Sequence, residues 1–175
     1  MGAGGLGGFY GGRLAKAGED VTFIARGSQL QALRQGGLRV KSTLIGDFEL
    51  SNLQATEDPA SVGGVDLVLM CVKAYDLDAA SRAIAPMIAA GTVVIPLLNG
   101  VDIAERMGAL VGFGQVLGGT TYTSANVLEP GTIRHLGMDR LIFGELEGGI
   151  SARGEAIKGA FTGAGVPAEL SPDVR

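Results

Sequence analysis

A glycine-rich segment directly after Met1 has the clearest chemical use in this sequence. In a dinucleotide-binding fold, the loop G-x-G-x-x-G joins the first strand to the first helix. Its first glycine makes a tight turn, its second lets the backbone approach a pyrophosphate, and its third lets the helix pack closely on the sheet. The helix N-terminus then offers unpaired N–H groups to the phosphates. The pattern is met by Gly2, Ala3, Gly4, Gly5, Leu6 and Gly7.

The loop alone also fits a glycine-rich turn in any α/β protein, so other residues must show whether it binds a dinucleotide. An NAD site usually places Asp or Glu at the end of the second strand, where it binds the ribose 2′-hydroxyl. Here the predicted strand Val21–Ala25 is followed by Arg26. A guanidinium cannot accept a hydroxyl proton, but it pairs with a 2′-phosphate and stacks on adenine. The sequence predicts NADP over NAD, with a solvated surface arginine as the alternative.

Two more polar residues follow buried strands. Lys73 comes after the strand Asp66–Val72, and Asn99 comes after the strand Thr92–Leu97. Ligands of open α/β sheets bind at the carboxyl ends of the strands. We therefore expect Lys73 to meet phosphate or ribose. Asn99, with both a donor and an acceptor, is expected to bridge cofactor and substrate. A solvated lysine and a plain Asn-Gly turn are the alternatives.

The remaining residues that could act in catalysis or bind a metal do not form a recognisable catalytic group. His135 is the only histidine, and its place after the main strand-end loops favours a structural role. Cys71 lies late in a buried strand and is expected to pack in the core. The carboxylates show no metal-ligand spacing, so no metal site is expected. No Ser, His and Asp set can be argued.

Strand and helix patterns alternate along most of the chain. This alternation predicts a doubly wound, Rossmann-like α/β fold with a mostly parallel sheet and helices on both faces. Residues 38–50 read as one or two edge strands. The expected helices are 4–18, 28–35, 76–90, 103–110 and 151–162. Further expected strands are 115–121 and 167–170, with 131–135 and 140–144 as a hairpin pair.

Composition narrows the function classes. The 175 residues suit one domain, and a net charge of −4 without a basic block gives no support for nucleic-acid binding. The single cysteine excludes an internal disulfide. No apolar run approaches ~18 residues, and no signal-peptide pattern is present, so we expect no membrane span and a cytoplasmic location.

Taken together, five segments resemble the ketopantoate reductase family in residues, order and spacing. Members are 2-dehydropantoate 2-reductases, which use NADPH to make pantoate for pantothenate and coenzyme A synthesis. The resemblance covers essentially the whole chain, and its motifs are specific as a set. The segments are Gly2–Gly7, Phe23–Gly27, Cys71–Asp76, Leu97–Val101 and Glu129–Ile133.

The resemblance implies a role for each matching residue. The loop 2–7 would hold the pyrophosphate, and Arg26 the 2′-phosphate. Lys73 would lie along the adenosine side of the site, and Asn99 would contact both cofactor and a small 2-keto acid substrate. Thr123, in the loop expected after the strand 115–121, would line the nicotinamide.

The chain departs from the family pattern at both ends, and we interpret it as truncated there. Members begin with a short apolar strand before the glycine loop, so we expect an open slot in the sheet here. Members also carry a helical C-terminal domain with the catalytic lysine, which no position here matches. We therefore expect an NADP-binding domain at 1–170 and the start of a linker at 171–175. A homodimer is an option for the full-length protein.

Two alternatives to ketopantoate reduction remain open at this point. One is a related NADP-dependent reductase acting on another 2-keto acid, because substrate choice depends largely on the C-terminal domain. The other is a non-catalytic NADP-sensing module.

Overall fold

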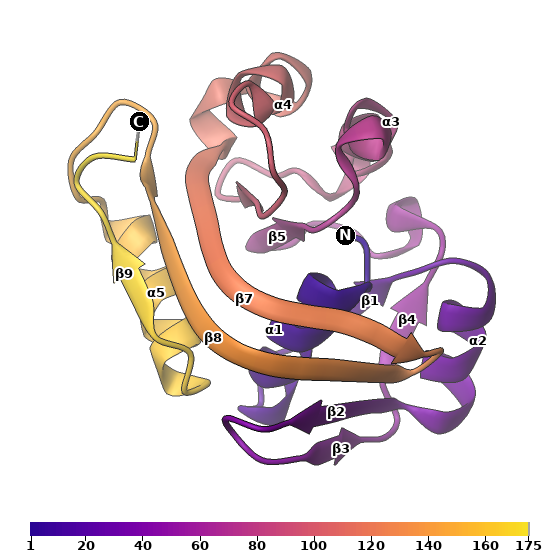
Figure 1. Cartoon of the computed structure of the whole chain (residues 1–175). Coiled ribbons are helices and arrows are strands. Elements are labelled where there is room, and N and C mark those ends of the chain that lie inside the picture. Colours follow the sequence, from indigo (N-terminus) through magenta and orange to yellow (C-terminus); the bar gives the residue numbers. More distant parts are fainter. Residues whose placement is uncertain (175) are drawn as a thin grey trace.

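Helices and strands alternate along the chain in an α/β fold, as the sequence predicts (Figure 1). The computed structural model describes residues 1–174, so Arg175 of the expected linker lies outside the described residues. The α-helices are α1 (Gly5–Lys16), α2 (Gly27–Gly36), α3 (Leu77–Ala83), α4 (Ile103–Val111) and α5 (Ala152–Gly163). Short 3-10 turns are η1 (Pro59–Ser61), η2 (Ala74–Asp76), η3 (Ala85–Met87) and η4 (Phe113–Gln115). The strands are β1 (Thr22–Ile24), β2 (Leu38–Ser42), β3 (Phe48–Leu50), β4 (Gln54–Thr56), β5 (Leu67–Met70), β6 (Val93–Pro96), β7 (Leu117–Glu129), β8 (Thr132–Glu145) and β9 (Ala168–Leu170).

Two short parallel pairs form one half of the fold. Strand β1 pairs with β4, and β5 pairs with β6. A single parallel bridge from Val94 to Val116 continues beyond β6 toward β7. The side chains of β5 and β6 alternate between two hydrophobic clusters, as those of a strand covered on both faces should. Helices α1 and α5 contribute to one cluster and α3 and α4 to the other, which confirms helices on both faces.

A long curved hairpin, β7–β8, runs past α1 and joins the remaining strands into a mixed sheet of order β3-β2-β8-β7, with β9 beside β8 (Figure 1). The expected hairpin between 131–135 and 140–144 is wrong, because residues 132–135 and 140–144 both belong to the single strand β8. Between these two segments, Gly137 and Met138 have positive φ angles, +149° and +53°, as residues in turns often do. In the structure they form a bulge, where Thr123 pairs with Asp139 and Ser124 with Gly137. The strand bends there and continues.

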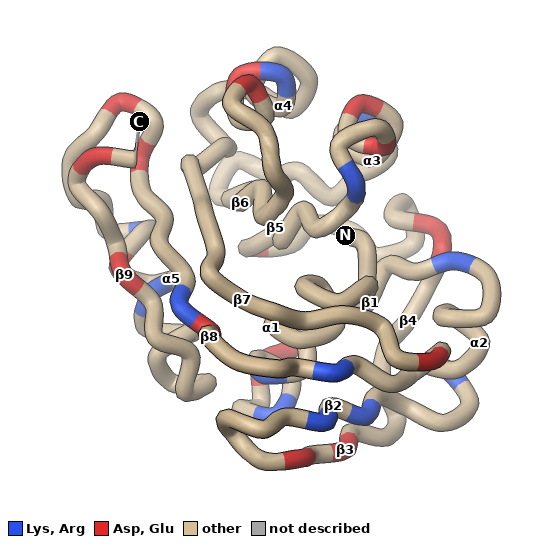
Figure 2. The backbone as a smooth tube through the Cα atoms, in the orientation of Figure 1, with Lys and Arg blue, Asp and Glu red and all other residues tan. Residues whose placement is uncertain are grey.

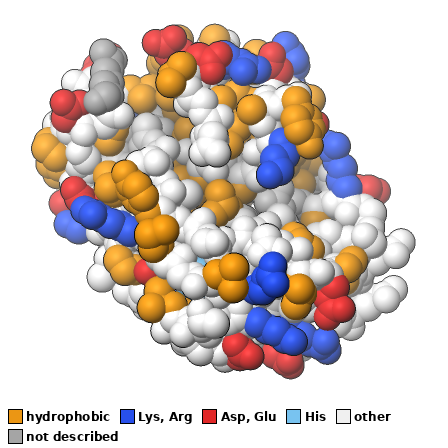
Figure 3. Space-filling model, viewed as in Figure 1, with side chains coloured by type: hydrophobic (Ala, Val, Ile, Leu, Met, Phe, Trp, Pro, Cys, Tyr) orange, Lys and Arg blue, Asp and Glu red, His pale blue; other side chains and the backbone are white. Residues whose placement is uncertain are grey.

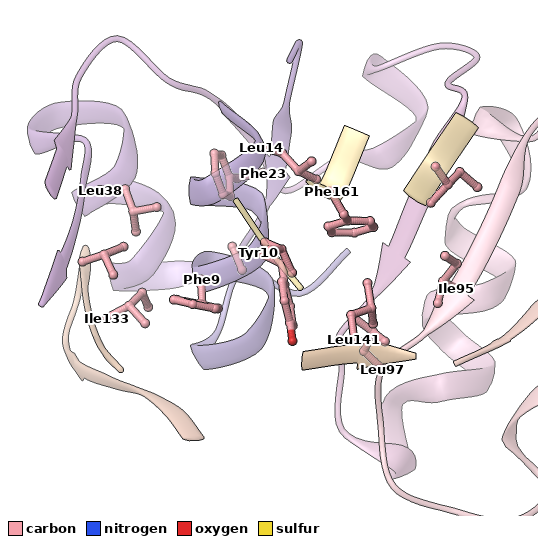
Figure 4. Close-up of a cluster of buried hydrophobic side chains, with 14 of the residues drawn as sticks. Phe9, Tyr10, Leu14, Phe23, Leu38, Ile95, Leu97, Ile133, Leu141 and Phe161 are labelled. Atoms are coloured by element: carbon pink, nitrogen blue, oxygen red, sulfur yellow. The ribbon is translucent and has the colours of Figure 1, made fainter. Parts of the chain in front are cut away.

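Helix α1 lies at the centre of the larger cluster. Phe9 and Tyr10 are fully buried, with Leu38 and Ile133 on one side and Leu141 and Phe161 on the other (Figure 4). Glycines bring the neighbouring elements close to this helix. A Cβ at Gly8, Gly11 or Gly12 would lie 2.8, 2.7 or 2.8 Å from side chains of Ile133, Phe23 and Leu38, respectively.

The expected slot lies between β1 and β5, which do not pair with each other. A cavity of about 690 Å³ occupies it. Met1 fills only the carboxyl end, where its amino group donates to Leu69 O and its carbonyl accepts from Cys71 N. Among residues 1–174, no helix is long and apolar enough to cross a membrane.

His135 is fully buried and holds the bulge of β8, a structural role as expected. Its Nε2–H donates to Met138 O at 2.8 Å, so Nδ1 accepts from the Ser42 hydroxyl at 2.8 Å. The Ser42 oxygen in turn accepts from the backbone N–H groups of Leu44 and Ile45. The imidazole also stacks on Phe9, with 4.1 Å between ring centroids. The histidine therefore ties β2, β8 and α1 together.

Substitution Ser42→Ala should lower the free energy of unfolding by about 1–3 kcal/mol, because it leaves a buried imidazole acceptor and two partly buried backbone donors without a partner. Urea denaturation measures the loss. The exposed Ser51→Ala should stay within about 0.5 kcal/mol of the parent. Equal stability of the two variants would contradict a stabilising role for the Ser42–His135 hydrogen-bond network.

Candidate dinucleotide-binding site

The glycine loop turns directly into α1 and leaves the helix N-terminus open. Gly2 adopts φ +88°, the left-handed region in which glycine carries no steric cost. Gly4 is the N-cap residue of α1, and no side chain caps the helix. No acidic residue stands in the first turn. The N–H groups and positive dipole end of α1 are thus available to an anion.

Each of three glycines has a distinct environment. A Cβ at Gly7 would lie 2.2 Å from Gly2 O, and a Cβ at Gly5 would lie 2.3 Å from Ala125 O. These distances are far inside contact, so only glycine fits either place. A Cβ at Gly4 would meet nothing within 4 Å. The loop is therefore packed on two sides and open at Gly4, which fits the approach of a pyrophosphate.

Backbone hydrogen bonds bring three strand ends to this loop. The N–H groups of Gly2 and Ala3 donate to Ile24 O at 3.1 and 3.0 Å, next to the end of β1. The Cys71 N–H donates to Met1 O at 2.8 Å, and the Leu97 N–H donates to Met70 O at 2.8 Å. The carboxyl ends of β1, β5 and β6 therefore lie at one edge, beside the N-terminus of α1.

The predicted cationic residues follow two of these strand ends. Arg26 comes after β1 as the N-cap residue of α2, and Lys73 comes after β5 as the N-cap residue of η2. Figure 2 shows Lys and Arg segments of the backbone tube just before α2 and α3. Both side chains are exposed, and neither makes an ion pair or hydrogen bond with residues 1–174. Two free cations thus stand at the edge where a phosphate-bearing ligand would lie.

Asn99 follows β6 in the exposed loop that leads to α4. The three residues Arg26, Lys73 and Asn99 are therefore at corresponding places, after β1, β5 and β6. In the same view, the space-filling surface is hollowed between the α3–α4 side and the β7–β8 hairpin, with Lys and Arg side chains at its rim (Figure 3).

Thr123 lies within β7 and not in a loop after it, which corrects the sequence expectation. Strand β7 extends to Glu129 because it pairs with β8 along most of its length. The Thr123 hydroxyl bonds to the Tyr10 hydroxyl and, at 2.7 Å, to the Thr121 hydroxyl. Burial raises the pKa of Tyr10, so its phenol stays protonated as a donor. This hydroxyl cluster fixes β7 against α1.

Gln29 supports the loop, and the sequence pattern did not indicate it. From α2, its Nε2 donates to Ala3 O at 2.9 Å, and its Oε1 accepts from Gly131 N at 3.0 Å. One side chain therefore joins the glycine loop to the turn between β7 and β8. No periodicity could have found it, because both partners are backbone groups distant in sequence.

Cys71 does not supply a reactive thiol. Burial raises the pKa of its thiol to about 11, so the thiolate is scarce at neutral pH. The side chain packs against the larger cluster. Within the part of the chain that the structure describes, no group of three or more His, Cys, Asp or Glu could hold a metal ion.

Comparisons with known proteins show which family and which relatives this chain resembles. Residues 1–148 match the family described as "Ketopantoate reductase PanE/ApbA". A 2-dehydropantoate 2-reductase of Archaeoglobus fulgidus is 34% identical over 99% of this chain and 55% of its own length. An uncharacterized oxidoreductase of Bacillus subtilis, YkpB, is 35% identical over 93% of this chain and 53% of its length. The chain thus spans about half the length of these relatives.

A solved structure shares the fold. The crystal structure of 2-dehydropantoate 2-reductase from Geobacter metallireducens superposes with a TM-score of 0.93 at 35% identity. The match covers 99% of this chain and 57% of that one.

Substitution Gly7→Ala should lower the free energy of unfolding by about 1–3 kcal/mol, because the new Cβ collides with Gly2 O. Gly159→Ala is the matched control, an exposed glycine of α5 with nothing within 4 Å of a Cβ. It should stabilise by about 0.5–1 kcal/mol through helix propensity. Chemical denaturation compares the two, and a stabilising Gly7→Ala would contradict the close approach.

Proposed function

The chain belongs to the ketopantoate reductase family, and on that premise we propose that it forms the NADPH-binding domain of a 2-dehydropantoate 2-reductase. That enzyme would reduce 2-dehydropantoate to pantoate for pantothenate and coenzyme A synthesis. The observation that carries the proposal is the open, uncapped N-terminus of α1 at Gly4, beside two unpaired cations.

The residues present fit a phosphorylated dinucleotide. The N–H groups at the start of α1 would hold the pyrophosphate, since a Cβ is absent where the phosphates approach. Arg26 would pair with the 2′-phosphate, because its guanidinium is exposed and unpaired. Lys73 would lie along the adenosine part, as the family resemblance implies.

Fewer residues of this chain would surround the nicotinamide and the substrate. NADPH supplies the hydride that reduces the 2-keto carbon. Asn99 would orient cofactor and substrate, because its amide both donates and accepts. Thr123 would line the nicotinamide side, held there by Tyr10 and Thr121. By resemblance, the proton for the developing alkoxide comes from a lysine of the C-terminal domain, which no residue here matches.

A second candidate is reduction of a different 2-keto acid with the same cofactor. By resemblance, Asn99 is the residue of this chain that would contact the substrate, and the Bacillus subtilis relative is named as an oxidoreductase without a substrate. A panel of 2-keto acids, tested with the whole enzyme, separates the two candidates.

Substitution Arg26→Asp should weaken NADPH binding about 10- to 100-fold and should favour NADH, because a charged hydrogen bond contributes about 1.5–3 kcal/mol. Cofactor fluorescence titration measures both affinities. Arg82→Asp makes the same charge change on exposed α3 and should leave them unchanged. Equal affinities of the parent chain for NADH and NADPH would contradict the assignment of Arg26.

The 175-residue chain should bind NADPH but reduce 2-dehydropantoate about 10²- to 10⁴-fold more slowly than a full-length relative, because by resemblance the lysine that acts as general acid lies outside these 175 residues. Absorbance of NADPH during turnover measures the rate, with the Geobacter metallireducens protein assayed in parallel. Comparable rates would show that residues of this chain supply the proton.

A further inference from the structure

Gln29 lies in the first turn of α2, three residues after Arg26, and its side chain is half-buried. The amide bonds two backbone groups outside its own helix. Its Nε2 donates to Ala3 O at 2.9 Å, and its Oε1 accepts from Gly131 N at 3.0 Å. A carboxamide donates only through nitrogen and accepts only through oxygen, so these two partners fix the way the amide faces. Gln29 thus ties α2 to two segments distant in sequence.

The first of these segments, the glycine loop, is held by its own backbone. The N–H groups of Gly2 and Ala3 donate to Ile24 O, and Gly4 N donates to Gly2 O at 2.8 Å. None of these bonds involves Gln29. The Ala3 carbonyl therefore offers α2 a fixed point beside the N-terminus of α1.

The second segment, the turn between β7 and β8, is equally well held, and Figure 1 shows its place next to α2. Gly131 has φ +80°, and a Cβ there would lie 3.1 Å from the Cβ of Ala32 and 3.3 Å from Gly37 O. Its carbonyl accepts from Arg39 N of β2 at 2.8 Å. The Gly131 N–H is therefore a second fixed point for Gln29.

The first turn of α2, by contrast, has weak support of its own. Arg26, Gly27 and Ser28 are all exposed. The first bond of the helix, from Leu30 N to Arg26 O, measures 3.4 Å. That is longer than the usual range of about 2.7–3.2 Å for N–H···O bonds. The amide of Gln29 is the side-chain tie within this turn, so the place of Arg26 relative to the glycine loop depends on it.

We propose that Gln29 is a positioning residue, which holds Arg26 at the separation from the glycine loop that a 2′-phosphorylated dinucleotide requires. The inference rests on the proposed function, because it concerns the same cofactor. Gln29 acts through the backbone of α2 and through Ala3, and it is not itself a ligand of the phosphates.

This role makes Gln29 a determinant of cofactor preference. NADPH would engage both the glycine loop and Arg26, whereas NADH has no 2′-phosphate and would engage the loop alone. Since the loop keeps its own backbone bonds when Gln29 is replaced, the loss should fall mainly on NADPH. A merely structural role would weaken both cofactors equally.

The test compares Gln29→Met with Gln31→Met, which makes the same change at an exposed position of α2. Gln29→Met should weaken NADPH binding about tenfold and NADH binding less than about threefold, as the loss of one or two hydrogen bonds allows. Gln31→Met should change neither affinity. Fluorescence titration measures the affinities, and urea denaturation of each variant separates a loss of folded protein from a loss of affinity. Equal losses for the two cofactors, or no loss for NADPH, would overturn the proposal.

A second variant keeps the proposal testable if Gln29→Met does not fold. Gln29→Asn retains a carboxamide but is one methylene too short to span both partners, so it should also lower the preference for NADPH over NADH. An unchanged preference in folded Gln29→Asn would overturn the positioning role.

A double-mutant cycle separates this inference from the proposed function. In an Arg26→Ala background, Gln29→Met should change NADPH affinity by less than about threefold, because the residue that it positions is gone. An undiminished tenfold loss in that background would overturn the positioning role alone. If Arg26→Ala by itself left the preference for NADPH unchanged, the assignment of Arg26 in the proposed function would be wrong, and the role of Gln29 would fall with it.

Discussion

The candidate site depends on close contacts between backbone segments of the glycine loop, α1 and β7, where glycines leave no Cβ in the way. Gly7, in the first turn of α1, packs against Gly2 O, and Gly5 packs against Ala125 O of β7, at distances that no side chain would allow. Because those contacts fix α1, the helix N-terminus has a fixed place relative to β1 and β5. The residues that follow these strands, Arg26 and Lys73, are thereby placed as well. Backbone packing therefore defines the proposed cofactor site, and exposed side chains complete it.

The long hairpin is the second support of the site, and it owes its shape to a buried histidine. His135 donates a hydrogen bond to the carbonyl of Met138 and accepts one from the hydroxyl of Ser42, so the bulge of β8 is held from inside the core. The resulting bend lets β7 run past α1, where Tyr10 meets Thr121 and Thr123. Gln29 completes the arrangement by joining the loop to the turn at Gly131. The polar contacts therefore tie three distant segments to one helix.

Much of the fold could be predicted from the sequence because buried parallel strands are short apolar runs. Strands β5 and β6 and helices α1, α4 and α5 fall where the pattern placed them. Strand β4 is short and polar, with no alternation to detect, and was not predicted. The bulge at Gly137 has the composition of a turn, and only pairing with β7 shows otherwise. At the site, the glycine pattern indicates Gly4, and one rule about strand ends gives the positions of Arg26, Lys73 and Asn99. Gln29 depends on tertiary contacts that no local pattern contains.

The slot and the glycine loop share Met1 and Gly2, which couples the two features. Backbone hydrogen bonds of Met1, Gly2 and Ala3 link the β1–β4 pair to the β5–β6 pair. The two sides of the sheet are otherwise joined by side-chain clusters and by the helices that cover them. Any shift of β1 against β5 must therefore change the backbone of the loop, since its hydrogen bonds reach both strands. The geometry of the proposed phosphate site is for this reason a property of the whole sheet.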